Sequence, residues 1–401
     1  MKLLIDSSNF DKENHLAYDG KNYFWTSEIG EDCFVMCGNP KKEYSIEHAC
    51  SLLGIEAPSI LEENQKKSFK ELNLQSSRIP SIFIYPPDKF KQRLKKVTEW
   101  ASDLYEDLDE YSYLKVFRRE LDVLLGMEPA LFDTTSFNRW CLGKNIDKKL
   151  KNSFSVNRFG YLQKTVYNNF STRTGRIVTQ SGPQFLTASK EIRGFLKSRY
   201  KNGKIVQLDF VSLEPRVALY AAKQSFVKDV YSMLNEVYFA NSLERSQIKK
   251  LVLCSLYGAG TRTLKKILPE NISPSKAVKD VRASMNFEAL VKRKKEELEK
   301  ESTMTNFFGR KIVPSSDRDA IIFNNWVQSS AVDVSLLGFS NLLKSFREDQ
   351  LKFNPLFLIH DALIIDASEE MIEKLESNKE INILIKDLGH FPLSVEYLSG
   401  N

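Results

Sequence analysis

The chain has 401 residues, of which 42% are hydrophobic, and this ordinary globular composition leaves room for two or three compact domains. Its net charge of +6 permits an acidic partner such as nucleic acid, whereas its five scattered cysteines do not suggest a disulfide framework. No apolar run approaches the ~20 residues of a membrane span, and the N-terminus turns polar too early for a secretory signal. We therefore expect a cytoplasmic protein without a membrane partner.

The first part of the chain is mixed in character, and a helical region follows it. Residues 1–88 hold short apolar stretches between polar loops, and the prolines of YPPDKF would stop regular structure near their end. From 89 to 127, apolar residues recur every three or four positions, which predicts helices. The basic stretch GKNIDKKLKN, at 143–152, reads as a loop that is either a solvated surface or a nucleic-acid contact.

From residue 204 onward, apolar strand patterns alternate with helical ones. KIVQLDF predicts a short strand that ends at Asp209. SLEPRVALYAAK predicts a helix, with Ser212 as its N-cap and Pro215 in its first turn. Further helical regions are predicted at 227–257, 276–303 and 318–345. The segments FLI, LIID and LSVEYL predict the closing strands.

Two aspartates fall at the ends of predicted strands. FLIHDALIID reads as strand, turn and strand, with His360 and Asp361 in the turn, and a tight turn alone would explain that aspartate. Asp209 also ends a strand, however, and two carboxylates at neighbouring strand ends repel each other unless cations hold them. Two magnesium ions bridged by aspartates are a standard device for nucleotidyl transfer. The pair therefore predicts a two-metal site, provided that phosphate-binding residues lie nearby.

The segment RSQIKKLVLCSLYG supplies such residues. Four of its members are spaced by four and would form one slowly drifting stripe on a helix: Arg245, Lys249, Leu253 and Tyr257. The two cations could grip a triphosphate, and the apolar and aromatic positions suit a flat base. Gly258 would end or bend the helix. An ordinary amphipathic helix with a basic edge would show the same pattern.

Together these segments resemble the motifs of family A DNA polymerases, in the family's order, from about residue 165 to the C-terminus. LDFVSLEPR resembles motif A, RSQIKKLVLCSLYG resembles motif B, and IHDA resembles motif C, which usually reads His-Asp-Glu. The resemblance implies that Asp209 and Asp361 are the catalytic, metal-binding aspartates and that the Phe210 carbonyl is a further ligand. It also implies two Mg²⁺ ions, for which Mn²⁺ can substitute.

The resemblance assigns nucleotide-binding roles as well. Arg245 and Lys249 match the triphosphate binders, Leu253 matches an aromatic position that stacks on the incoming base, and Tyr257 matches the tyrosine at the templating position. Glu214 falls on the sugar gate, whose carboxylate fills the space that a ribose 2′-hydroxyl would need. Deoxynucleotides are therefore the expected substrates.

Further segments resemble the parts of the family that hold primer and template. TRTGRIVTQSGPQF places Arg176 in the minor groove at the primer end, and EIRGFL places Arg193 in a similar neighbourhood. FFGRK and NNWVQSSAVDV match the stretch in which Asn324 and Gln328 would test base-pair shape through minor-groove acceptors. His360 would lie against the primer terminus.

Three positions depart from the family pattern. Ala362 stands where motif C has glutamate, which predicts altered metal tuning rather than loss of activity. Leu253 and Cys254 replace an aromatic residue and a glycine in motif B. Because leucine cannot stack as a ring does, we expect weaker nucleotide binding.

The implied fold is α+β: a right-hand polymerase with an antiparallel palm sheet, helical fingers and a reduced thumb, preceded by a small N-terminal α/β extension. The expected parts are an extension of unreadable role at 1–88, a reduced thumb with connecting helices at 89–160, palm at 161–235, fingers at 236–304 and palm again at 305–401. The residues before the polymerase-like part are too few for a proofreading domain, so no exonuclease is expected.

The expected function is template-directed DNA synthesis on a primed template, with deoxynucleoside triphosphates as substrates and a replisome or processivity partner to compensate for the short thumb. The missing nucleases favour a small phage or plasmid replicon, in a bacterial or phage-infected cell, and the sequence leaves a role in repair open. Two alternatives stay open: a primase-like or single-subunit RNA polymerase-like enzyme, and a non-catalytic DNA-binding subunit. Glu214 and the Thr-Gly-Arg segment disfavour the first, and the paired aspartates and cations disfavour the second.

Overall fold

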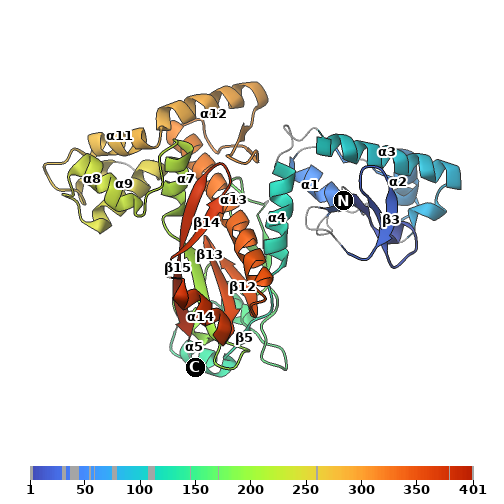
Figure 1. Cartoon of the computed structure of the whole chain (residues 1–401), viewed down its shortest axis with the longest axis horizontal. Helices are drawn as coiled ribbons and strands as arrows, with labels where there is room; N and C mark the ends of the chain where they lie inside the picture. The colour runs from blue at the N-terminus through green and yellow to red at the C-terminus, as the bar shows by residue number, and fades with distance from the viewer. Residues whose placement is uncertain are drawn as a thin grey trace. The chain divides into compact units, whose positions relative to one another are not determined.

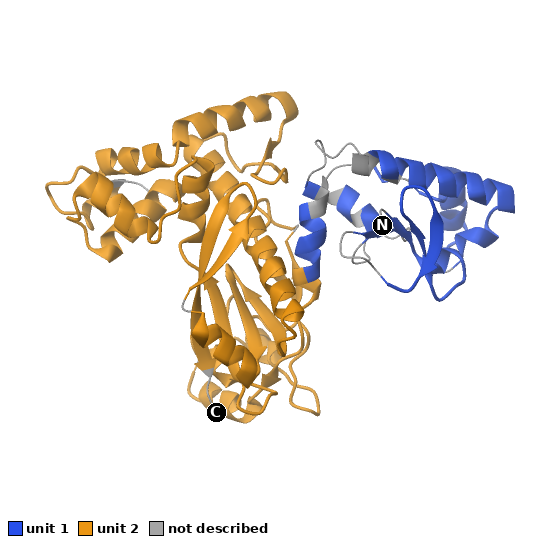
Figure 2. Ribbon diagram, viewed as in Figure 1, with its two compact units in different colours: residues 1–122 blue, residues 123–401 orange. Residues whose placement is uncertain are grey.

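A computed structural model describes residues 3–28, 33–36, 45–53, 56–57, 59–74, 79–106, 113–144, 146–169, 171–258, 261–378 and 380–399. The chain divides into two compact units, Met1–Asp122 and Val123–Asn401 (Figure 2). Within the described ranges, no helix is both long enough and apolar enough to cross a membrane.

Unit 1 is built on a four-stranded mixed sheet of order β3-β2-β1-β4. Its strands are β1 (Leu3–Ile5), β2 (His15–Tyr18), β3 (Tyr23–Thr26) and β4 (Phe34–Met36). The central strand β1 is fully buried and pairs antiparallel with β2 and parallel with β4. The helices of this part of the chain are α1 (Ile46–Leu53), α2 (Glu63–Glu71), α3 (Pro87–Glu106) and α4 (Tyr113–Leu125), the last of which continues past the unit boundary.

Helix α3 belongs with the sheet of unit 1. The ring of Phe10 packs edge-on against Trp25 and Phe90, with centroids 5.2 and 5.7 Å away. The hydroxyls of Tyr23 and Thr98 share a hydrogen bond of 2.7 Å. The compact N-terminal unit therefore extends beyond the prolines at which the sequence suggested its end.

Unit 2 is organised around an antiparallel sheet of five strands, in the order β12-β13-β9-β15-β14 (Figure 1). These strands are β9 (Lys204–Phe210), β12 (Phe353–Ile359), β13 (Ala362–Ala367), β14 (Ile381–Ile385) and β15 (Gly389–Ser399). The strands predicted from KIVQLDF, FLI, LIID and LSVEYL are thus confirmed. In the central register, Asp209 of β9 lies between Ala362 of β13 and Ser394 of β15.

The two faces of this sheet are packed differently. On one face lies the 30-residue helix α13 (Asp319–Glu348), whose Phe339 ring is 5.1 Å from that of Phe210. A Cβ at Gly338 would come within 2.6 Å of the same ring, so α13 approaches β9 closely. The other face carries an aromatic cluster, in which Phe185 and Phe357 have centroids 4.3 Å apart. Because side chains alternate along a strand, Asp209 points to this second face.

The remaining elements of unit 2 are mostly helical, and several gather beyond one end of the sheet (Figure 1). The longer helices are α5 (Thr134–Cys141), α7 (Leu213–Ala221), α8 (Val230–Phe239), α9 (Arg245–Tyr257), α11 (Pro274–Ser284), α12 (Phe287–Glu301) and α14 (Glu369–Ser377). The shorter ones are α6 (Lys148–Ser153) and α10 (Thr261–Lys265). Short two-stranded sheets pair β5 (Leu131–Phe132) with β8 (Leu196–Lys197), β6 (Val166–Asn168) with β7 (Val178–Ser181), and β10 (Met304–Thr305) with β11 (Lys311–Ile312).

Local sequence explains most of these boundaries. Gly258 ends α9 in the left-handed conformation, at φ 72°, as predicted. Ser212 occupies the N-cap position of α7, as predicted, but its backbone is left-handed and its side chain makes no cap hydrogen bond. The basic stretch 143–152 includes an exposed part of α6, whose N-cap Asp147 accepts a hydrogen bond from the Leu150 amide.

Candidate functional site

A cavity of about 840 Å³ opens where β9, α7, α9, α13 and the β12–β13 turn meet. The segment 172–187 forms another part of its wall. Ten of the residues singled out in the sequence line it: Arg176, Asp209, Phe210, Glu214, Lys249, Leu253, Tyr257, Gln328, His360 and Asp361. Three others do not: Arg193, Arg245 and Asn324.

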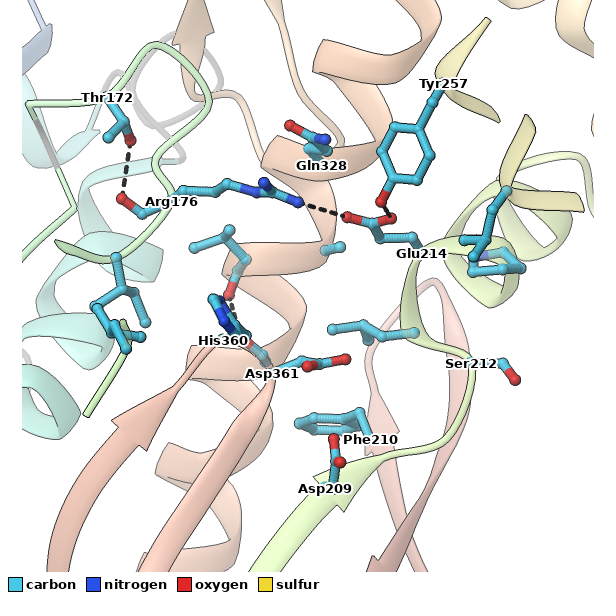
Figure 3. Close-up of a pocket in the computed structure, with 18 of the residues that line it drawn as sticks. Thr172, Arg176, Asp209, Phe210, Ser212, Glu214, Tyr257, Gln328, His360 and Asp361 are labelled. Atoms are coloured by element: carbon cyan, nitrogen blue, oxygen red, sulfur yellow. Dashed lines mark hydrogen bonds and ion pairs between the residues drawn. The ribbon is translucent and has the colours of Figure 1, made fainter. Parts of the chain in front are cut away.

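The two aspartates meet because their strands are neighbours. Ile359 pairs with Ala362, so His360 and Asp361 form a two-residue hairpin turn, and His360 has a φ of 56°. Ala362 in turn pairs with Asp209, and the amide of Phe210 donates a hydrogen bond of 3.3 Å to the carbonyl of Asp361. Figure 3 shows the two aspartates close together at the strand ends. The predicted strand–turn–strand arrangement is confirmed.

Both carboxyl groups are partly withdrawn from water. Burial, together with the charge of Asp361, raises the pKa of Asp209 to about 6, against the pull of Lys190 and Arg193 in the opposite direction. Burial also raises the pKa of Asp361. The two negative charges are therefore unfavourable without a compensating cation.

The donor set at this point fits a hard divalent cation. Within the described ranges, no group of three or more His, Cys, Asp or Glu side chains is arranged to hold a metal. Asp209 and Asp361 instead provide two carboxylates, with the backbone of Phe210 beside them. Magnesium commonly takes only one or two protein carboxylates and completes its shell with water and substrate phosphates, so two aspartates suffice.

Glu214 is held from two sides above the aspartates. The hydroxyl of Tyr257 donates a hydrogen bond to its carboxylate, and a guanidinium nitrogen of Arg176 lies 3.5 Å from its other oxygen (Figure 3). Burial raises the pKa of Glu214, and burial next to Glu214 raises that of Tyr257. Helices α7 and α9 and the segment before β7 are thereby joined by one polar cluster at the cavity wall.

Helix α9 lines the cavity with most of its predicted stripe. Lys249, Leu253 and Tyr257 face the cavity. Arg245, in the first turn, instead forms an ion pair with Asp229, the N-cap of α8, and its guanidinium lies 5.6 Å from the ring centre of Tyr231. The spacing of four therefore predicts one helix face for three of the four residues, whereas Arg245 is paired with Asp229 outside the cavity lining.

The family model of DNA polymerase family A matches residues 149–401, which is more than half of the chain. The chain belongs to DNA polymerase family A. A solved structure with which it also aligns is the polymerase domain of Pol1 from M. smegmatis, in complex with DNA primer-template and dNTP. The sequences are 17% identical, the TM-score is 0.48, and the alignment covers 88% of this chain and 62% of that one. No protein with a curated description matches the chain.

Two residues that the family resemblance assigns to DNA do not line the cavity in this family A chain. Arg193 is only 8% exposed, and one of its terminal nitrogens donates a hydrogen bond of 2.8 Å to Gln207, two residues before Asp209 on β9. Asn324 lies one turn before Gln328 on α13, and its side-chain oxygen is buried without a hydrogen-bond partner among the described residues.

Other residues of the site were not singled out in the sequence. Tyr231 of α8 lines the cavity, and Lys190 and Glu396 act electrostatically on Asp209. Glu396 is paired with Gln207 across β15 and β9, on the same face of the sheet as Asp209. The LSVEYL pattern predicts a strand but not which residues pair with it. The sequence alone therefore could not place Glu396 on the same face of the sheet as Asp209.

Proposed function

We propose that this family A chain is a template-directed DNA polymerase that adds deoxynucleotides to a primer 3′ end. One observation carries the proposal: the β9 end and the β12–β13 turn bring Asp209 and Asp361 together in a cavity whose wall presents Lys249 and the Glu214–Tyr257 pair. Carboxylates for metal ions, a cation for phosphates and a carboxylate near the sugar are the groups that such a reaction needs.

Asp209 and Asp361, with the Phe210 carbonyl, would hold the divalent cations, Mg²⁺ or Mn²⁺. Bound in pairs, such ions activate an attacking hydroxyl and neutralise the leaving pyrophosphate. Lys249 would neutralise the triphosphate from the helix side. Arg245 could join it only by releasing Asp229, which would accompany a movement of α9 over the nucleotide.

Sugar selection would be set by Glu214. Tyr257 and Arg176 hold its carboxylate in one place, so a ribose 2′-hydroxyl would have to displace a group that is already hydrogen-bonded. Leu253, which lines the cavity, would contact the base without stacking on it. This arrangement supports deoxynucleotides over ribonucleotides.

Primer and template would enter beside these groups. Arg176, His360 and Gln328 face the cavity and are proposed to contact the primer terminus and the minor groove. Arg193 and Asn324 would need a rearrangement to do so; in the present structure, Arg193 supports the strand that carries Asp209. The five-stranded sheet is proposed as the palm, and residues 236–304, which include α9–α12, are proposed as the fingers. Two further expectations stay predictions: that the chain does not proofread, and that it works with a processivity partner.

Primer extension with purified protein, a primed DNA template and Mg²⁺ tests the proposal. We expect templated extension with deoxynucleotides, reduced at least about a thousandfold by Asp361→Asn, since nucleotidyl transfer depends on the paired carboxylates. Asp387→Asn is the matched control, because Asp387 is an exposed turn residue of the same unit and makes the same change of charge outside the cavity. Equal activity in both variants, or tight DNA binding by the wild type without extension, would overturn the proposal.

A further inference from the structure

A buried polar network joins the turn between β10 and β11 to helix α13. The Asn306 side chain donates a hydrogen bond of 2.5 Å to Asp333, and its oxygen accepts the amides of Phe308 and Arg310. Arg310 is 7% exposed, and its Nε lies 3.6 Å from the fully buried Asp333 carboxylate. The network therefore fixes the direction in which the Arg310 guanidinium leaves its turn.

That guanidinium ends against a different segment of the chain. One of its terminal nitrogens donates a hydrogen bond of 3.1 Å to the carbonyl of Asn169. The same nitrogen lies so close to Gly175 that a Cβ there would come within 1.6 Å of it. Gly175 has a φ of 76°, which a side chain would also disfavour. Glycine thus lets the backbone rest directly on Arg310.

The segment that rests on Arg310 delivers a residue of the cavity. The amide of Gly175 donates to the carbonyl of Thr172, closing a turn, and the Thr172 hydroxyl donates a hydrogen bond of 2.9 Å to the carbonyl of Arg176 (Figure 3). Arg176 itself reaches Glu214. A line of contacts therefore runs from α13 through Arg310 to the sugar-gate carboxylate.

We propose that Arg310 is a positioning residue, which holds the 171–176 loop in the place from which Arg176 meets Glu214 and the primer end. This inference rests on the proposed function, although the positioning itself can be measured without it. Arginine suits the task because its planar fork can serve Asp333 and Asn169 at once, whereas a lysine ammonium would keep the charge and lose the fork.

The first test is hydrogen exchange in the full chain. Arg310→Lys should speed exchange of the amides at 171–176, including that of Gly175, at least about tenfold, because the turn loses its support. The matched control is Arg199→Lys: Arg199 also joins a buried aspartate, Asp366, to a backbone carbonyl, but that carbonyl belongs to Pro129 and not to the segment beside the 171–176 loop. Unchanged protection of the loop in Arg310→Lys would overturn the inference, whether or not the protein extends primers.

The second test is a double-mutant cycle on single-nucleotide addition. If Arg310 acts through Arg176, Arg310→Lys should lower kcat/KM about tenfold in the wild type and less than about twofold in an Arg176→Ala background. Equal losses in both backgrounds would show a merely structural role and overturn the inference. A wild type that cannot extend primers would instead count against the proposed function, and the exchange measurement would still decide the positioning.

Gly175→Ala covers the case in which Arg310→Lys does not fold. It keeps the residues Asn306, Asp333 and Arg310, but the added Cβ must displace either the loop or the guanidinium, and both break their contact. We expect the same loss of loop protection and the same non-additivity with Arg176→Ala. Normal protection and normal kcat/KM in Gly175→Ala would contradict the inference.

Discussion

The hydroxyl of Tyr257, at the end of α9, donates a hydrogen bond to the carboxylate of Glu214, in the first turn of α7. The two residues are 43 positions apart in the sequence. Arg176 approaches the same carboxylate from the opposite wall. The proposed sugar gate is thus a fixed part of the cavity wall rather than a free side chain.

The first prediction concerns sugar selection. Glu214→Ala should lower the preference for deoxy- over ribonucleotides, as the ratio of kcat/KM values, at least about tenfold, because the volume that opposes the 2′-hydroxyl is lost. Glu214→Gln keeps that volume and should retain most of the preference. Tyr257→Phe should have an intermediate effect. A preference that survives Glu214→Ala would remove Glu214 from the gate.

The second prediction separates the two cations of motif B. Lys249 faces the cavity, whereas Arg245 is paired with Asp229. Lys249→Ala should raise the KM for nucleotide roughly tenfold, as expected for the loss of one charge-assisted contact. If Arg245 joins the phosphates only after α9 moves, Arg245→Ala should lower kcat more than it changes the initial affinity measured by nucleotide titration. An equal loss of initial affinity in both variants would contradict this division of roles.

The third prediction concerns the position against the base. Leu253→Phe should lower the KM for nucleotide several-fold, because base–aromatic stacking is worth ~1–3 kcal/mol per base. Leu253→Met is the control, since it changes shape without adding a ring. The measurement is the KM for one correct deoxynucleotide on a fixed template. Equal KM values in the two variants would show that the base does not stack at this position.

The fourth prediction concerns the stability of the metal-free protein. The pKa of Asp209 is raised from 3.8 to about 6. Above pH 6 the side chain is ionised in both states, and its charge costs more free energy in the folded state than in the unfolded state. Asp209→Asn should therefore stabilise the protein in EDTA at pH 8, by roughly 1 kcal/mol after allowance for solvent screening. The gain should shrink as the pH falls from 6 to 4, because wild-type Asp209 then binds a proton. Thermal unfolding at pH 8 and at pH 4, with Asp387→Asn as control, measures this gain in stability. If Asp209→Asn destabilises the protein at pH 8, the prediction is wrong.

Much of the site could be predicted because it follows from local patterns. The short apolar runs in KIVQLDF and FLIHDALIID predicted the strands β9, β12 and β13 and put Asp209 and Asp361 at strand ends, and antiparallel pairing then brought those ends together. The spacing of Lys249, Leu253 and Tyr257 similarly fixed one face of α9.

The remainder depends on contacts between distant segments. The ion pair of Arg245 with Asp229 and the burial of Arg193 under Gln207 are set by how helices and strands pack, which no local pattern encodes. The same holds for α3, which packs in unit 1 through Phe90 and Thr98. These long-range contacts determine which of the predicted residues reach the cavity.

The most direct measurement is the addition of a single nucleotide opposite each of the four template bases, with Mg²⁺ and each deoxynucleotide in turn. The account predicts that only the complementary deoxynucleotide is added efficiently, and that Asp209→Asn abolishes its addition while leaving binding to primed DNA intact. Addition that ignores the template base, or efficient addition by Asp209→Asn, would contradict the assignment of the cavity as a templated nucleotidyl-transfer site.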